Sequence, residues 1–147
     1  MKFRQNDGGR AAAGFMVPAG DCACRATAIA MQRDYREVYD ELDAFAKQFE
    51  TQYEGVGEFY PSGVESGYWH EALTAYLKPL GWRYVDGPLE LSERLHLNER
   101  ELPSGRIICR LSKQYAAVID GVLETTYDCS RDEYFVYGYW QKETADE

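Results

Sequence analysis

The 147-residue sequence has no long hydrophobic run and is poor in positive charge. Nothing approaches the 18 consecutive apolar residues of a membrane-spanning helix, and the first 15 residues, MKFRQNDGGRAAAGF, lack the apolar segment of a signal peptide. Lys and Arg total 16 against 25 Asp and Glu, a formal net charge of −9. This charge disfavours binding to nucleic acid or to an anionic membrane. We therefore expect a cytoplasmic protein that binds neither.

Histidine and cysteine are also scarce. The chain has two histidines, His70 and His96, and four cysteines, Cys22, Cys24, Cys109 and Cys129. A chain of this size with 45% hydrophobic residues does not depend on disulfides, so we expect free thiols. A Cys-x-Cys pair with no second pair or neighbouring His does not supply the four ligands of a structural zinc site. We predict no metal and no cofactor. A redox or metal module built on Cys22 and Cys24 is a weaker hypothesis than the two functions given at the end of this section.

What the sequence does contain is typical of a globular domain. Aromatic residues make up 14% of the chain, 12 of them tyrosines, which is too rich for a disordered protein. There is no internal repeat and no low-complexity segment. We predict one domain over residues 1–147, with four parts: an extended lead-in (1–20), a helical half (21–81), a strand-rich half (82–140) and an acidic tail (141–147).

Three helices are predicted in the first half of the chain. Asp21 is a good N-cap for a helix that begins at or beside Cys22 and runs to Met31, and Asp34 is a good N-cap for an amphipathic helix over 35–49. A third helix is predicted over 68–80, ended by Pro79 and Gly81. The Gly-rich segment 50–67 between the second and third helices predicts a long loop, functional or mobile.

The second half predicts strands. Segments rich in β-branched and aromatic residues lie at 82–85, 106–112, 115–120, 122–128 and 134–140. Asp120-Gly121 between two of them is typical of a tight hairpin. Helices followed by strands predict an α+β fold, in which the helical half packs on a C-terminal antiparallel sheet.

Cys22 is the strongest candidate for chemistry. At a helix N-terminus the macrodipole and the free amide groups favour the thiolate, and the same amides could stabilise an oxyanion. The alternative is a small buried residue that packs as a hydrophobe. Cys24 lies two positions further on, toward the other side of the helix, and is predicted to pack in the core.

Several motifs resemble a known group of proteins. They are NDGGRAAAGF (6–15), GDCACRATAIA (20–30), YREVYDEL (35–42), GW (81–82), SKQYAAVIDGVLETTYDCSR (112–131) and VYGYW (136–140). In combination they resemble small uncharacterised phage and bacterial proteins with a papain-like cysteine-peptidase fold, allied to the bacteriocin-processing peptidases. The resemblance implies a papain-like fold and, if a phage encodes the chain, a location in the host cytoplasm.

Carried over residue by residue, the resemblance gives Cys22 the position of the nucleophile and Asp128 that of the orienting carboxylate. Gln114 stands where the pattern has the general-base His, and Thr125 stands where a further Asp is expected. Gln cannot accept a proton from a thiol because its amide is not basic near neutral pH. The sequence leaves three explanations open: natural degeneration, an engineered substitution, or a different chemistry.

The oxyanion hole is also incomplete in the sequence. Papain-like enzymes place a Gln a few residues before the cysteine, where this chain has MVPAG, while Gln5 and Asn6 lie much further upstream. The backbone amide of Cys22 is the economical candidate.

Two functions follow from the sequence. The first is a papain-like cysteine hydrolase of the peptidase or isopeptidase type, or a catalytically impaired member of that fold. The second is a non-catalytic phage or bacterial binding protein that engages a basic host protein. The expected partner in either case is a peptide or a protein.

Overall fold

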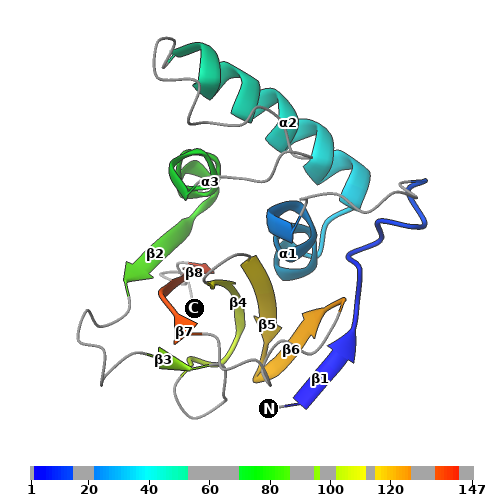
Figure 1. Ribbon diagram of the computed structural model, residues 1–147, viewed down its shortest axis with the longest axis vertical. Coiled ribbons are helices and arrows are strands. Elements are labelled where there is room, and N and C mark those ends of the chain that lie inside the picture. The colour runs from blue at the N-terminus through cyan, green and yellow to red at the C-terminus, as the bar shows by residue number, and fades with distance from the viewer. Residues whose placement is uncertain are drawn as a thin grey trace.

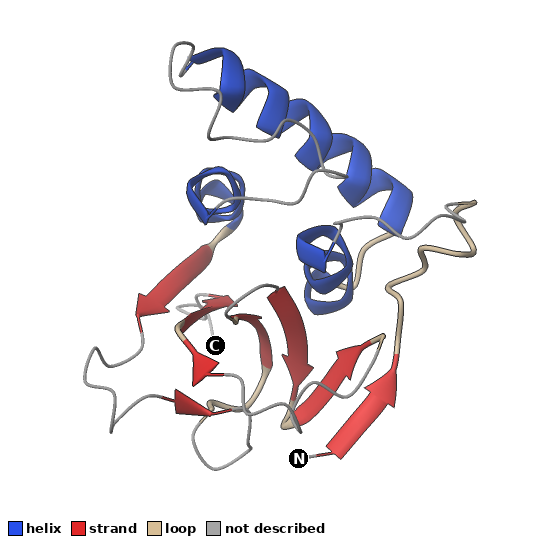
Figure 2. Ribbon diagram, in the orientation of Figure 1, coloured by secondary structure: helices blue, strands red, loops and turns tan. Residues whose placement is uncertain are grey.

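Helices cover one face of a six-stranded sheet (Figures 1 and 2). The computed structural model describes residues 2–14, 22–52, 70–86, 95–96, 102–111, 115–126 and 135–142, with backbone alone for 46–52, 70–72, 95–96 and 135. Within these residues the helices come from the first half of the chain and most strands from the second half. The α+β class predicted from the sequence is confirmed.

The helices begin close to where the sequence predicts them. They are α1 (Cys22–Met31), α2 (Tyr35–Gln52) and α3 (His70–Leu77), which continues into the 3₁₀ turn η2 (Lys78–Leu80). The Asp34 carboxylate caps α2 by accepting a hydrogen bond from the Glu37 amide at 3.1 Å. Residues 50–52, expected to open the long loop, are helical, whereas Asp21 and the rest of that loop lie outside the described residues. None of the helices in the described ranges is long and apolar enough to cross a membrane.

The main sheet has the strand order β1-β6-β5-β4-β8-β2. Its strands are β1 (Lys2–Gln5), β2 (Trp82–Asp86), β4 (Arg106–Arg110), β5 (Tyr115–Ile119), β6 (Val122–Thr125) and β8 (Gly138–Lys142). A second, two-stranded sheet pairs β3 (Leu95–His96) with β7 (Phe135–Val136). The predicted strand 134–140 is therefore divided between the two sheets.

The prediction of a wholly antiparallel sheet is wrong, because residues 2–5 of the predicted lead-in form a strand of the main sheet. These residues form β1, which pairs in parallel with β6, so the sheet is mixed and not wholly antiparallel. A parallel neighbour must come from a distant part of the chain, here from its first residues. Local pattern gave no sign of this strand because the segment KFRQ has a single apolar residue, Phe3.

The predicted Asp120-Gly121 hairpin is confirmed. It joins the antiparallel strands β5 and β6, with Ile119 directly opposite Val122. Both turn residues have positive φ, 48° for Asp120 and 82° for Gly121, as a two-residue hairpin requires. Asp120 also accepts a hydrogen bond from the Gly105 amide at 2.8 Å, which ties the hairpin to the start of β4.

Side chains alternate between two cores on the two faces of the sheet. The helix-facing core joins α1, α2 and α3 to residues such as Ile108, Ala117 and Trp140. The far core contains Ile107, Val118 and other residues of the opposite parity. The buried side of α1 is rich in alanine, so this helix packs closely over β5. That packing determines where the first residue of α1 lies.

A polar cluster joins the helices away from the sheet. The Arg33 guanidinium, in the turn before α2, pairs with Glu37 and contacts both Glu41 carboxylate oxygens, at 3.0 and 2.7 Å. Tyr76 of α3 donates its hydroxyl to Glu41 at 2.7 Å. The ion pair and this hydrogen bond lower the pKa of Glu41. The cluster fixes α2 against α3.

Candidate functional site

Cys22 is the first residue of α1, and its side chain is half-buried. Its Sγ atom lies 3.4 Å from the backbone nitrogen of Tyr115 and accepts a hydrogen bond from that amide. The first amides of a helix have no partner within the helix and form its positive end. The thiol therefore lies at a positive helix terminus, with a further amide directed at the sulfur.

The contact with Tyr115 relates Cys22 to the other positions that the resemblance singled out. Tyr115 is the first residue of β5 and directly follows Gln114 in the sequence. Two segments 93 positions apart thus meet at the sulfur atom. Gln114 and Asp128 themselves lie outside the described residues, as does Cys129.

Four residues on four strands form a row that starts at this contact. Tyr115 lies opposite Arg110, Arg110 opposite Gly138, and Gly138 opposite Asp86. Directly opposed residues in antiparallel strands share a face, and Tyr115 belongs to the helix-facing core. Adjacent strands are about 4.8 Å apart, so Gly138 lies roughly 10 Å across the sheet from Tyr115.

Tyr84, two residues before Asp86 in β2 and on the same face of the sheet, reaches this row. Its phenol occupies the space beside Gly138 that a side chain would fill. Burial raises the pKa of Tyr84, while the nearby Arg110 guanidinium acts in the opposite direction. The hydroxyl is therefore held neutral beside a guanidinium, on the same sheet face as Cys22.

The sequence analysis missed a buried carboxylate, Glu124 in β6. Only 7% of the residue is exposed, and its Oε1 accepts a hydrogen bond from Asn6 Nδ2 at 2.9 Å. Glu124 lies opposite Ala117, a residue of the helix-facing core. The available signal was the alternation in β6, which puts Glu124 on the opposite face from Leu123.

The remaining sequence candidates are placed as follows. Cys24 is fully buried, as predicted, and its thiol lies 4.0 Å from the Tyr35 carbonyl oxygen. Thr125 follows Glu124, so it faces the far core and not the side where Cys22 lies. Gln5 is exposed in β1, and Asn6 is bonded to Glu124. The histidine backbones lie in α3 (His70) and β3 (His96), and their side chains lie outside the described part.

The NDGG motif forms a turn against α1. Asp7 accepts hydrogen bonds from the amides of Ala11 and Gly9, at 3.0 and 2.9 Å, and the bond from Ala11 is the main cause of its lowered pKa. A Cβ on Gly8 would lie 3.1 Å from the Arg25 carbonyl oxygen, so the turn approaches α1 closely. The motif supports the helix that carries Cys22.

Among the described residues, no group of three or more His, Cys, Asp and Glu side chains is placed to hold a metal ion.

Comparisons of the chain with protein-family models, with curated proteins and with solved structures found no match.

Proposed function

We propose that the chain is a papain-like cysteine hydrolase, or a catalytically impaired member of that fold, with Cys22 as the nucleophile. One observation carries the proposal: the Cys22 thiol lies at the start of α1 and 3.4 Å from the amide at the start of β5. Cys22 is also partly exposed to solvent, unlike Cys24. The substrate class is a peptide or an isopeptide.

The reaction is acyl transfer. The Cys22 thiolate attacks the carbonyl carbon, a C–S bond forms, and the C–N bond breaks as the leaving amine takes up a proton. Water then hydrolyses the thioester, which releases the acid and returns the thiol. Backbone amides at the start of α1, that of Cys22 among them, would stabilise the oxyanion.

Gln114 limits the rate in this proposal. In the resembling proteins this position holds the His that accepts the thiol proton, and Asp128 has the position of the group that orients it. With an amide at 114, the thiolate must form without a basic neighbour there. The helix terminus and the Tyr115 amide both favour the charged sulfur. The proposal therefore predicts a reactive thiol with slow turnover.

Labelling with iodoacetamide at neutral pH, followed by peptide mapping, tests the nucleophile. Cys22 should react faster than glutathione under the same conditions, and fully buried Cys24 should react only after unfolding. The Cys22→Ser variant identifies the labelled peptide. Labelling of Cys22 no faster than that of glutathione would contradict the proposal.

Restoring a base tests the role of position 114. Gln114→His should raise the labelling rate of Cys22 and reveal peptidase activity, while the matched Gln114→Asn variant should change neither. If the two variants have the same labelling rate and the same peptidase activity, residue 114 takes no part in the chemistry of Cys22.

A second candidate function is a non-catalytic protein that binds a basic partner. Gln114 at the position of the base favours it, together with the net charge of −9. Such a partner, captured on immobilised protein, should be released as salt screens the charges. Capture that does not depend on salt would argue against an electrostatic binding role.

A further inference from the structure

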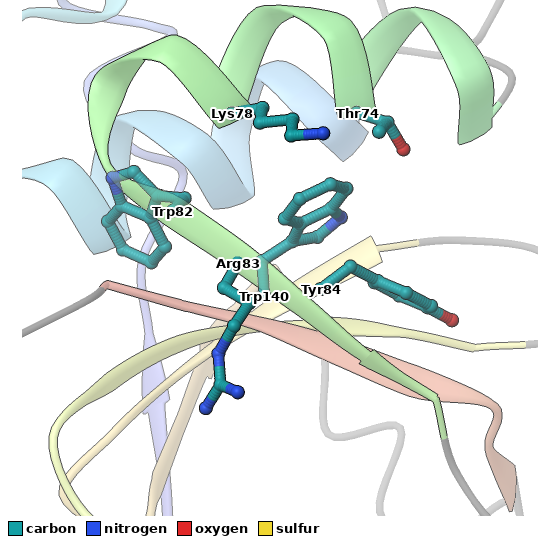
Figure 3. A pocket seen from close by; sticks show the side chains of 6 residues that line it. All are labelled: Thr74, Lys78, Trp82, Arg83, Tyr84 and Trp140. Carbon is teal, nitrogen blue, oxygen red and sulfur yellow. The ribbon is translucent and has the colours of Figure 1, made fainter.

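A second site is suggested by a pocket of about 280 Å³ between the end of α3 with η2 and the strands β2 and β8 (Figure 3). Its described lining consists of Thr74, Lys78, Trp82, Arg83, Tyr84 and Trp140. None of these described lining residues comes from α1 or β5. The pocket is therefore separate from the Cys22–Tyr115 contact.

Aromatic side chains form the walls. Trp82 and Trp140 are 3% and 1% exposed, so both indoles are fixed by their surroundings. The rings of Tyr84 and Trp140 lie with centroids 5.1 Å apart and planes at 56°. Rigid aromatic surfaces favour an apolar or aromatic ligand group because little side-chain entropy is lost on binding.

Two polar groups, from Lys78 and Thr74, line the pocket on its helical side. In Figure 3 the Lys78 ammonium and the Thr74 hydroxyl extend from the helical side toward the space over Trp140. The Arg83 guanidinium extends to the opposite side of β2, as alternation along the strand requires. None of the described lining residues is acidic, although the chain as a whole carries a net charge of −9. The pocket thus offers a local cation beside aromatic surface.

We propose that this pocket binds a carboxylate that carries an aromatic or large apolar group. The carboxylate contacts Lys78 and Thr74, and the apolar group packs against the partly exposed Tyr84, beside the buried Trp140. At about 280 Å³ the pocket lies just below the roughly 300 to 1,000 Å³ that is common for ligand sites, so it takes a group no larger than a single amino acid. A free aromatic acid and the C-terminal residue of a peptide share this chemistry. The inference is independent of the function proposed for Cys22.

Titration with N-acetylphenylalanine tests the site, with tryptophan fluorescence and the indole N–H signals of Trp82 and Trp140 as reporters. We expect saturable binding, about tenfold weaker for N-acetylphenylalaninamide, which lacks the charge, and weaker again for N-acetylalanine, which lacks the ring. A non-saturating response, or equal affinity for acid and amide, would overturn the proposal. The peptide Ala-Ala-Phe distinguishes the sources: binding as tight as the single residue indicates peptide C-termini, and its exclusion indicates a small aromatic acid.

Two variants separate a specific contact from general attraction of an anion. Lys78→Gln should weaken binding of N-acetylphenylalanine about tenfold. Arg83→Gln removes the same charge from a lining residue whose guanidinium points away, and should change affinity less than twofold. Equal losses in the two variants would contradict the assigned carboxylate position. Lys78 is exposed, so its replacement leaves the folded core intact. Cys22→Ser should bind as the parent chain does, whatever the outcome for Cys22 chemistry.

Discussion

The phenol of Tyr84 occupies the position where Gly138 would carry a side chain. A Cβ built on Gly138 collides with the Tyr84 hydroxyl and lies 2.5 Å from Tyr84 Cζ and 2.7 Å from the Val85 carbonyl oxygen. Gly138 therefore makes possible the contact between the rings of Tyr84 and Trp140, whose centroids lie 5.1 Å apart.

The first prediction concerns this contact. Gly138→Ala should lower the free energy of unfolding by about 1 to 3 kcal/mol, because the added methyl group overfills a packed region. Urea denaturation measures the change. In a Tyr84→Leu background the cost of the same substitution should fall, since the obstructing phenol is gone. An identical cost in both backgrounds would show that Tyr84 is not the obstructing group.

The second prediction concerns the pH dependence of the Arg33–Glu41–Tyr76 cluster. Arg33 lowers the pKa of folded Glu41 from its ordinary value of 4.5, and the Tyr76 hydroxyl lowers it further. The ionised carboxylate therefore stabilises the fold above about pH 4.5, and this contribution is lost as the pH falls through the lowered pKa. Glu41→Gln should cost about 0.5 to 1 kcal/mol at pH 7, because the side chain is 43% exposed and screened by solvent.

Asp40→Asn provides the matched control for Glu41→Gln. Asp40 and Arg36 are both more than half exposed and lie 3.5 Å apart. Loss of this exposed ion pair should change the free energy of unfolding little at any pH. The difference in free energy of unfolding between the parent chain and Glu41→Gln should narrow as the pH falls. The prediction is wrong if it does not narrow, or if Asp40→Asn shows the same loss and the same pH dependence.

The third prediction concerns Asn6 and Glu124. Asn6→Ala removes the 2.9 Å hydrogen bond to a carboxylate in a residue that is only 7% exposed. The expected loss is about 1 to 3 kcal/mol, the cost of a buried acceptor without its donor. Arg4→Ala, which removes a 69% exposed side chain 4.0 Å from the same carboxylate, should cost less than about 0.5 kcal/mol. Chemical denaturation compares the two, and similar losses would indicate that Arg4 is the main partner of Glu124.

The sequence could predict the helices because their signals are local. Asp34 lies at the start of an amphipathic repeat, and its carboxylate caps α2 in the structure. Gly121 predicts the hairpin by an equally local signal, because a residue without a side chain adopts a positive φ readily. The strand at residues 2–5 has no such signal, because its pairing with β6 arises from the tertiary fold.

The candidate site was predictable in part. Cys22 could be selected from its place at a predicted helix start, but the amide of Tyr115 reaches it only through the packing of α1 over β5. The Tyr84–Gly138 contact depends on the register of β2 and β8, which no local pattern specifies. Glu124 resembles a surface residue in sequence, and it is buried through tertiary contacts that include β1 and Asn6.

The pairing of β1 with β6 has a consequence for the order of folding. Asn6 and Glu124 are 118 positions apart, so this edge of the sheet cannot close until the residues between them and β6 itself have left the ribosome. Until then β6 presents unpaired backbone groups that another chain can join. Once β1 is in place, the sheet ends on a strand with the cationic residues Lys2 and Arg4, which repels a like edge. Strand β1 is thus made well before β6 but protects the β6 edge from aggregation only after β6 has been made.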